Sequence, residues 1–481
     1  MKNYKLNIPK YSLGFEVIGQ WILYFTSIIV VYFLPSIIKY PYFLILLFIT
    51  FISKKDYWWI AFFIIIFANI GGLFSQTSIA EGVYQRLPLY KFGPIRLPLY
   101  DMFLSLLLLK SIRYGKVRTF YNDLLSLIII YILLLFMFSF VLGMDDNSLE
   151  AGLRFLIRAS LFYSIPRIIS TKDKIIKIHK LLFNGLIMVI ISVIYTLITG
   201  YEIGNKFLNI YKSVYEFGEY RFLDSPYLIF LSFIFLSYWL ISNENIGIKK
   251  SILAILMVLS YILIILSATR GWFISFTIMM LIILFMNLNK KGSIKNSIMV
   301  VLICFLLLFS LYTNFQNIFN NIFNRLKSIE LLAKGDITAG GTLSRINVRG
   351  PAMLKKVKEN PLIGFGFSKE YYIYADNHVG WIMQLLQMGI IGTLLIIYLF
   401  IRIVTHIRKI VKITNNSSYY VFIIGLIGLI IIHSTSTAIF SFTYLGAAGP
   451  IYELLVLMLT TIDVLTKEDS YLINKMEKSK I

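Results

Sequence analysis

Charged residues are scarce in this 481-residue sequence. They make up 15% of the chain, whereas apolar residues make up 58%, and the mean hydropathy is +0.78. No water-soluble fold of this length keeps so few charges, because its surface must be solvated by water. The scarcity therefore excludes a soluble globular protein and predicts that lipid surrounds most of the chain.

Acidic residues and cysteine are also few. There are 24 acidic residues against 46 lysines and arginines, which gives a net charge of +22. In a soluble protein this excess would suggest a nucleic-acid partner, but in a membrane protein basic cytoplasmic loops produce it, so no nucleic-acid partner is expected. Cys304 is the single cysteine, which excludes an intrachain disulfide and a metal site built from cysteines.

The nucleotide-binding motifs of soluble enzymes are missing as well. Gly364-Phe365-Gly366 lacks the rest of a dinucleotide fingerprint, and there is no Walker lysine loop. We interpret this GFG as a turn that directs the chain back into the membrane. The predicted outer loops contain no DxD or DDxxD pair, so a bound diphosphate would have to be neutralised by arginine. No metal ion or other cofactor is expected.

Long apolar runs are what the sequence has instead. About fourteen runs approach the length that crosses a bilayer, and between 12 and 14 spans are expected, because the fourth run is short and the sixth carries arginines. The expected fold is all-α, that of a polytopic integral membrane protein. The runs lie near residues 15–35, 36–53, 57–74, 97–110, 121–143, 150–169, 181–200, 226–242, 251–268, 271–288, 297–313, 378–401, 419–437 and 443–464.

Lysines and arginines are unevenly divided between the two sets of connections. About 27 lie on the side that includes the first ten residues and the C-terminal tail, and about 19 lie on the other side. Because basic residues mark the cytoplasmic side, both chain ends are predicted to be cytoplasmic. The first apolar run lacks a small-residue cleavage signal, so we interpret it as a retained helix and not a signal peptide.

One outward connection, residues 314–377, is much longer than the others. Loops of this length are uncommon unless they are functional. It divides the chain into residues 1–313 with eleven spans, the outer loop, and residues 378–481 with three spans and a cytoplasmic tail. Within the loop, a basic helix is predicted to stop before Pro361. Its apolar positions are compatible with a helix on the membrane surface: Ile346, Met353, Leu354 and Val357.

Arginines at the membrane spans are the first candidates for a site, since charge there is costly. Arg270 lies between two apolar runs that almost no loop separates. The alternative to a role in a site is that its charged group only snorkels to the membrane interface. Arg158 lies roughly 12 Å from the start of its helix, which is deeper in the membrane than a charge at the surface would lie. Arg154 is expected to form a structural ion pair with Glu150. Arg221 and Arg345 also face outward, and together these arginines suggest a phosphate ligand, which guanidinium forks match.

His378 stands at the entrance to a predicted span and has a side chain suited to proton transfer near neutral pH. The alternative is that it only caps the helix that starts near Val379. The other histidines are weaker candidates. His179 and His406 are predicted in basic inner loops, and His433, within a span, is compatible with a satisfied core histidine.

Two segments carry a resemblance to a known family. NPLIGFGFS (360–368) and NHVGWIMQLLQMGIIG (377–392) resemble the hallmark of the O-antigen ligase and polymerase family. Thr269-Arg270-Gly271 resembles the family's serine-arginine-glycine, and Ser344-Arg345 resembles the arginine that opens the loop helix. Arg221, before Asp224-Ser225-Pro226, is a looser match. The chain departs from the family at three positions: Thr269 for serine, Val379 for asparagine and Gln387 for the frequent glutamate.

The resemblance implies glycosyl transfer on the outer face of the cytoplasmic membrane. Such proteins take a glycan linked through diphosphate to undecaprenol and transfer it to an acceptor hydroxyl. We favour a polymerase that joins lipid-linked repeat units into a surface polysaccharide; the alternative is a ligase that moves the finished glycan to a lipid or protein anchor. Expected partners are the lipid-linked oligosaccharide, the glycan acceptor, the lipid bilayer and a chain-length regulator. Arg270, Arg345, Arg221 and Arg158 would bind substrate, and His378 would act as general base.

A transporter or lipid flippase is the alternative from another class, and a scaffold or sensor is a third. Transporters also have many spans, membrane arginines and broken helices, but they often show matching halves. No such repeat is evident here, and a single long outer loop makes the chain asymmetric. These features favour glycosyl transfer.

Overall fold

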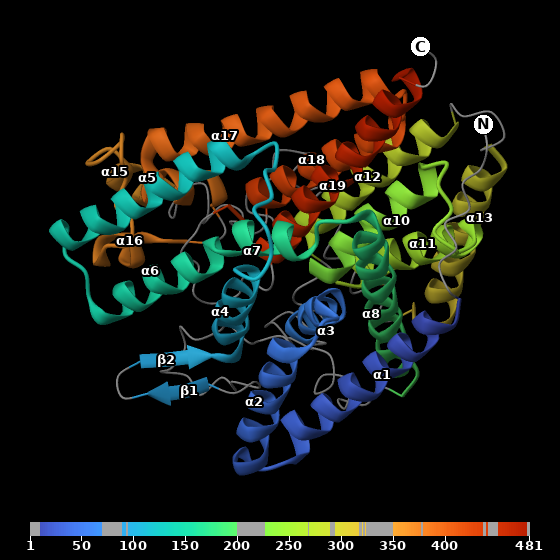
Figure 1. Ribbon diagram of the computed structural model, residues 1–481, viewed down its shortest axis with the longest axis horizontal. Coiled ribbons are helices and arrows are strands. Elements are labelled where there is room, and N and C mark those ends of the chain that lie inside the picture. Colours follow the sequence, from blue (N-terminus) through green and yellow to red (C-terminus); the bar gives the residue numbers. More distant parts are fainter. Residues whose placement is uncertain are drawn as a thin grey trace.

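The computed structural model describes residues 10–69, 89–92, 95–199, 227–267, 269–288, 294–316, 320, 323, 350–376, 379–435, 439–440 and 451–478. In these residues helices predominate, with one small β-hairpin, so the all-α expectation is confirmed (Figure 1). The helices are α1 (Lys10–Phe33), α2 (Ser36–Ile52), α3 (Asp56–Asn69), α4 (Leu99–Ser111), α5 (Asn122–Val141), α6 (Asp146–Ala159), α7 (Leu161–Ile168), α8 (Lys172–Thr199), α10 (Tyr227–Ile241), α11 (Lys250–Leu266), α12 (Arg270–Leu288), α13 (Ile294–Asn314), α15 (Gly350–Val357), α16 (Lys369–Tyr374), α17 (Gly380–Thr414), the 3-10 turn η3 (Ser417–Tyr419), α18 (Tyr420–Thr435) and α19 (Ile451–Lys478).

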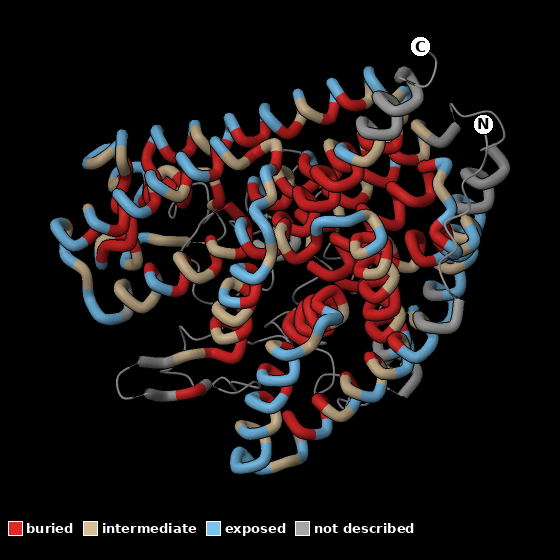
Figure 2. The backbone as a smooth tube through the Cα atoms, viewed as in Figure 1, coloured by how far each residue is buried: buried red, intermediate tan, exposed pale blue. Residues whose placement is uncertain are grey.

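Burial of the apolar residues fits a membrane protein. Within the part of the chain that the structure describes, four segments are long and apolar enough to cross a bilayer: Gly14–Val31, Asn122–Val141, Gly380–Thr414 and Ser417–Thr435. α10 is buried along its whole length, as expected of a helix that is apolar on every side. In contrast, α1 and α2 expose apolar side chains on their outer face, which suits contact with lipid (Figure 2).

All fourteen predicted apolar runs coincide with helical structure, but several boundaries differ. The sixth run, 150–169, is two helices, α6 and α7, which meet at Ser160. The short fourth run is preceded by an antiparallel hairpin of β1 (Leu89–Phe92) and β2 (Ile95–Pro98), in a connection where no strand was predicted. Pro98, at the N-cap of α4, ends the hairpin and begins the helix.

Two predicted inner loops are helical extensions of their spans. α8 begins at Lys172, so His179 is buried within a helix and does not lie in a loop. α17 continues to Thr414 and therefore contains His406. Both expectations were wrong because a basic, polar segment can continue a helix past the membrane as readily as it can form a loop.

Connections that were predicted on the same side contact one another. Lys110, at the end of α4, donates to the carbonyls of Thr50 at 2.6 Å and Ser53 at 2.5 Å, where α2 ends. Lys172, at the start of α8, pairs with Glu244 in the connection between α10 and α11 at 3.0 Å. The alternation of the helices that hydropathy predicted is thus reproduced in the packing.

Candidate active site at the end of α17

The segment 360–368 docks against a break in α17. In an unbroken helix, the amides of Ile390 and Ile391 would donate to the carbonyls of Leu386 and Gln387. Here those amides donate to the carbonyls of Pro361 at 2.9 Å and Leu362 at 3.1 Å. The carbonyls of Leu386 and Gln387 accept instead from the amides of Phe365 and Gly366, both at 2.8 Å. Four hydrogen bonds with the loop therefore replace two within the helix. We name this arrangement the clasp.

Three glycines make the clasp possible. Gly364, Gly366 and Gly389 have φ values of 78°, 57° and 60°, which side chains rarely adopt. The break at Gly389 has ψ of −168°, a region that is essentially confined to glycine. A Cβ on Gly364 would lie 2.6 Å from the carbonyl oxygen of Gln387. The GFG turn predicted from the sequence is confirmed, and its glycines also permit close backbone contact with α17.

α5 holds the clasp from the other side. The hydroxyl of Tyr131 donates to the carbonyl of Met388 at 2.6 Å, and the amide of Phe367 donates to the hydroxyl of Ser139 at 2.7 Å. The amide of Lys369 donates to the carbonyl of Gly143, where α5 ends, at 3.0 Å. Irregular backbone is tolerated at membrane depth only where protein satisfies its polar groups, and these contacts do so.

Two short helices from the large loop pack over the clasp and beside α17 (Figure 1). Met353 and Val357 of α15 are buried against Met383 and Leu386 of α17, whereas Leu354 is 41% exposed. The expectation that this apolar face lies on the membrane surface is therefore wrong for Met353 and Val357; Ile346 lies outside the described residues. The helix does end before Pro361, as predicted.

Lys356 connects the two short helices. Its ammonium group pairs with Glu359 and with Glu370 of α16, both at 2.7 Å, and it lies 4.9 Å from the centre of the Phe365 ring. The hydrogen bonds to Glu359 and Glu370 raise the pKa of Lys356 above its ordinary value. Lys356 therefore remains charged at neutral pH and fixes α15, α16 and the clasp together.

The end of α18 brings the start of α12 and the start of α17 to the same level. Ser275 of α12 donates to the carbonyl of Gly428 of α18 at 3.0 Å. Arg270 precedes Ser275 by five residues, and His433 follows Gly428 by five. Because α12 and α18 are antiparallel, Arg270 and His433 lie at the same height along the two helix axes. On the other side, Gly380 packs against the backbone of His433. The indole of Trp381 donates to Ser434 at 2.8 Å.

His378, Arg345 and Arg221 lie outside the described residues, but the elements that follow them do not. His378 precedes Gly380, the first residue of α17, by two residues. Arg345 precedes α15, which packs on α17. Arg221 precedes Tyr227 at the start of α10, whose ring centre is 5.3 Å from that of Trp272 in α12.

Arg270 itself is half-buried at the first position of α12. α18 packs against both α12, which begins at Arg270, and α17, which begins two residues after His378. The sequence context of the two residues did not show that their helices share this neighbour. The N-cap residue of α17 is Val379, whose apolar side chain accepts no hydrogen bond from the amide groups of the first turn.

Arg158 belongs to a separate group of charges. Arg154 pairs with Glu150, as predicted, and also with Asp101 of α4 at 3.2 Å. Arg158 lies 4.0 Å from Asp101, and its guanidinium is 5.4 Å from the centre of the Tyr100 ring. Sequence analysis missed Asp101 because hydropathy cannot show which charges in separate helices meet. Two carboxylates balance the two arginines, so these contacts account for Arg158 without a ligand.

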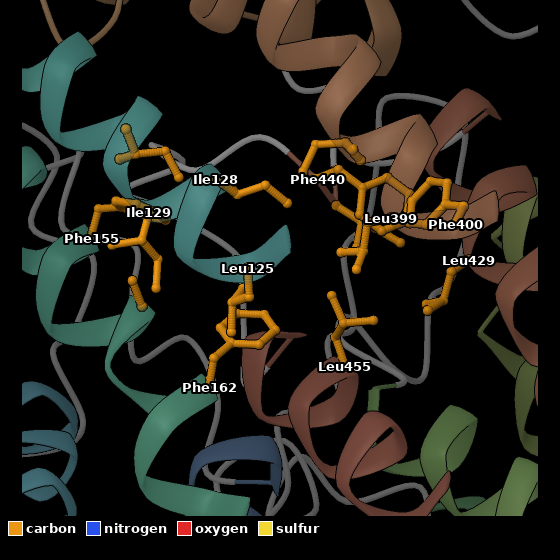
Figure 3. Close-up of a pocket in the computed structure, with 14 residues that line it drawn as sticks. Leu125, Ile128, Ile129, Phe155, Phe162, Leu399, Phe400, Leu429, Phe440 and Leu455 are labelled. Atoms are coloured by element: carbon orange, nitrogen blue, oxygen red, sulfur yellow. The ribbon is translucent and has the colours of Figure 1, made fainter. Parts of the chain in front are cut away.

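An apolar pocket lies between α5, α6, α7, α17, α18 and α19 (Figure 3). Phe155 and Phe162 face Leu399 and Phe400 across it, and Leu455 closes one side. Phe440, which lines the pocket, also contacts the His433 ring at a centroid distance of 4.8 Å. The described residues that line it are all apolar, so the pocket suits a hydrocarbon chain. It approaches the end of α18 through Phe440.

Comparison with known proteins finds a family match over one part of the chain. Residues 255–397 match the family model described as O-antigen ligase. The match runs from α11 through the first part of α17, and so includes Arg270, the large loop and the clasp. No curated protein matches the chain. The resemblance noted in the sequence is confirmed.

Proposed function

We propose, starting from the O-antigen ligase family domain that residues 255–397 form, that this membrane protein transfers a glycan from undecaprenyl diphosphate to an acceptor hydroxyl. The acceptor in our proposal is a second lipid-linked repeat unit, so the product is a growing surface polysaccharide. The site and the large loop face outward, and both chain ends are cytoplasmic.

One observation carries the proposal: α18 contacts both α12, through Ser275 and Gly428, and the start of α17, through His433 and Gly380. In the reaction, the acceptor oxygen attacks the anomeric carbon of the donor sugar, and the bond from that carbon to the diphosphate oxygen breaks. Undecaprenyl diphosphate leaves with the bonding electrons. Arg270 is placed to stabilise the charge that develops on this leaving group.

The proton of the acceptor hydroxyl must be removed as the oxygen attacks. His378 is our candidate for the general base, since a neutral imidazole accepts a proton at neutral pH. Val379 holds the N-cap position of α17. The assignment of the N-cap to Val379 favours the catalytic role of His378 over a capping role. Arg345 and Arg221 would approach the same ligand from the segments that precede α15 and α10.

The lipid part of the substrate needs an apolar environment close to the reacting atoms. The pocket in Figure 3 is lined by apolar side chains and reaches the end of α18 through Phe440. We propose that it accommodates part of the prenyl chain. Arg158 adjoins Ala159, which lines this pocket, and it pairs with Asp101. We therefore propose that Arg158 acts beside the lipid chain and not on the diphosphate.

The description of the matching family favours a second candidate, a ligase that moves the finished glycan to a lipid or protein anchor. A gel of surface polysaccharide from a deletion strain separates the two. Loss of the ladder with one repeat unit remaining on the anchor indicates a polymerase. Long chains that stay on the lipid carrier indicate a ligase. An unchanged ladder would contradict both candidates.

A further inference from the structure

His433, in the last turn of α18, has one ring nitrogen for which the structure offers no partner. The side chain is fully buried. Nδ1 accepts the backbone N–H of Phe440 at 3.3 Å, which assigns the proton of a neutral imidazole to Nε2. Nε2 is buried and has no hydrogen-bond partner in the part of the chain that the structure describes. A buried donor without an acceptor is costly, so it indicates a place for a ligand atom.

The imidazole ring of His433 lies beside the first turn of α17. Cδ2, the ring atom bonded to Nε2, lies 3.2 Å from the position that a Cβ on Gly380 would occupy. The Trp381 ring packs edge-on against the imidazole at a centroid distance of 4.6 Å, and so fixes its orientation. The N-terminus of a helix attracts anions through its amide groups and its dipole. The buried donor therefore lies close to this helix terminus.

Gln384 adds a second buried polar group on the same side of α17. It follows Gly380 by four residues, and residues at this spacing lie on one face of a helix. Its side chain is fully buried, and neither its oxygen nor its nitrogen has a partner in the described ranges. A second donor is thus available about one helical turn below Gly380.

We propose that the Nε2–H of His433 and the side-chain amide of Gln384 bind an oxygen of the lipid diphosphate at the N-terminus of α17. This inference rests on the proposed function. Both groups are neutral donors, so they recognise an anion without the cost of burying a further positive charge. Arg270, half-buried at the membrane face, supplies the charge, and the two buried donors fix the position of the anion.

Two substitutions at His433 distinguish this role from a structural one. In His433→Gln, the amide nitrogen replaces Nε2 and keeps the donor toward α17. In His433→Asn, the amide oxygen replaces Nδ1 and keeps the acceptor for Phe440, but the donor is lost. We would measure the affinity of the purified full-length protein in detergent for radiolabelled undecaprenyl diphosphate. We expect His433→Gln to bind within about threefold of wild type and His433→Asn to bind about tenfold or more weakly, the usual effect of losing a hydrogen bond to a charged group.

Gln384→Leu is the second test, and it remains informative if both His433 variants fail to fold. Removing an unsatisfied buried amide should leave the melting temperature unchanged or raise it, while affinity for undecaprenyl diphosphate falls about tenfold. His179→Asn is the control, because His179 is equally buried but both its nitrogens have partners, Trp239 and Thr461. Its affinity should match that of wild type.

The outcomes separate this inference from the proposed function. If wild type binds no undecaprenyl diphosphate, the proposed function fails. If wild type binds it, and His433→Asn and Gln384→Leu bind equally well, only the present inference is overturned. Tighter binding by His433→Asn than by His433→Gln would also overturn it, since that order shows that only the contact with Phe440 matters.

Discussion

Arg270 offers a direct test at the level of a single side chain. Arg270→Lys keeps the charge but replaces a planar fork with a point charge that cannot bind two diphosphate oxygens at once. We expect at least a tenfold loss of glycan transfer, with normal insertion into the membrane. Glycan transfer would be measured with purified protein and lipid-linked substrate.

The matched control is Arg402→Lys, an exposed arginine farther along α17. It should retain full activity. An Arg270→Lys protein that makes wild-type amounts of polymer would show that Arg270 only snorkels to the interface.

His378 predicts a particular dependence of activity on pH. A general base must be neutral to act, so turnover should fall as the pH drops through the ordinary pKa of histidine, about 6.5. His378→Asn should lower turnover by about 10²–10⁴-fold and leave binding of undecaprenyl diphosphate nearly intact. A pH–rate profile of wild type and a turnover measurement on the variant test both points. An active asparagine variant would instead support the capping role.

Single residues also show how far the sequence can be interpreted. The Glu150–Arg154 pair was predictable, because residues four apart on a helix are neighbours. The contact of Asp101 with Arg154 and Arg158 was not predictable, since it depends on how α4 packs against α6. His433 was recognised as a buried histidine, but its unpaired nitrogen became visible only when the positions of Phe440 and Gly380 were known.

Among the elements, α17 depends most on its clasp. At Gly389, alanine would have to adopt a backbone conformation that is nearly confined to glycine, at a cost of about 1–3 kcal/mol, and its Cβ would displace Leu362. We therefore expect Gly389→Ala to lower the unfolding free energy by about 2 kcal/mol or more. Thermal unfolding in detergent would measure the change.

Gly115→Ala is the control for this prediction. Gly115 has no heavy atom near the position of an added Cβ and no positive φ, so the change should stay within about 0.5 kcal/mol. If both variants melt like wild type, the break in α17 does not require glycine.

Hydropathy predicted α17 as one span, and it could not predict the break. The average over a run of residues stays high whether or not the helix is continuous. What decides the break is an exchange of backbone hydrogen bonds with residues 361–366, about 25 positions earlier in the chain. The glycines were visible in the sequence, but their partners were not.

For the whole molecule, the orientation in the membrane can be tested with engineered cysteines. Cys304→Ala removes the only native thiol. Lys358→Cys places a thiol at an exposed position of the large loop, and Lys54→Cys places one in an exposed connection that was predicted to be cytoplasmic. We expect a membrane-impermeant maleimide to label residue 358 in intact cells and residue 54 only after permeabilisation. The reverse pattern would invert the topology.

At this scale the sequence predicted the helices well, because they follow from the cost of placing polar backbone in lipid. The side of the membrane on which each connection lies stays a prediction, which follows from the distribution of basic residues. It did not predict which helix ends meet. Ser275 and Gly428 are far apart in the chain, and nothing in their local sequence indicates a contact.

The place of α18 between α12 and α17 also determines when the site can form during synthesis. The clasp joins residues close together in the chain, so it can close once residue 391 has been made. α12, which begins at Arg270, and the start of α17 both contact α18, whose residues 420–435 are translated after them. A ribosome that stalls before this point leaves a chain with its clasp but without the helix that both elements contact. The proposed site is therefore expected only in chains completed through α18.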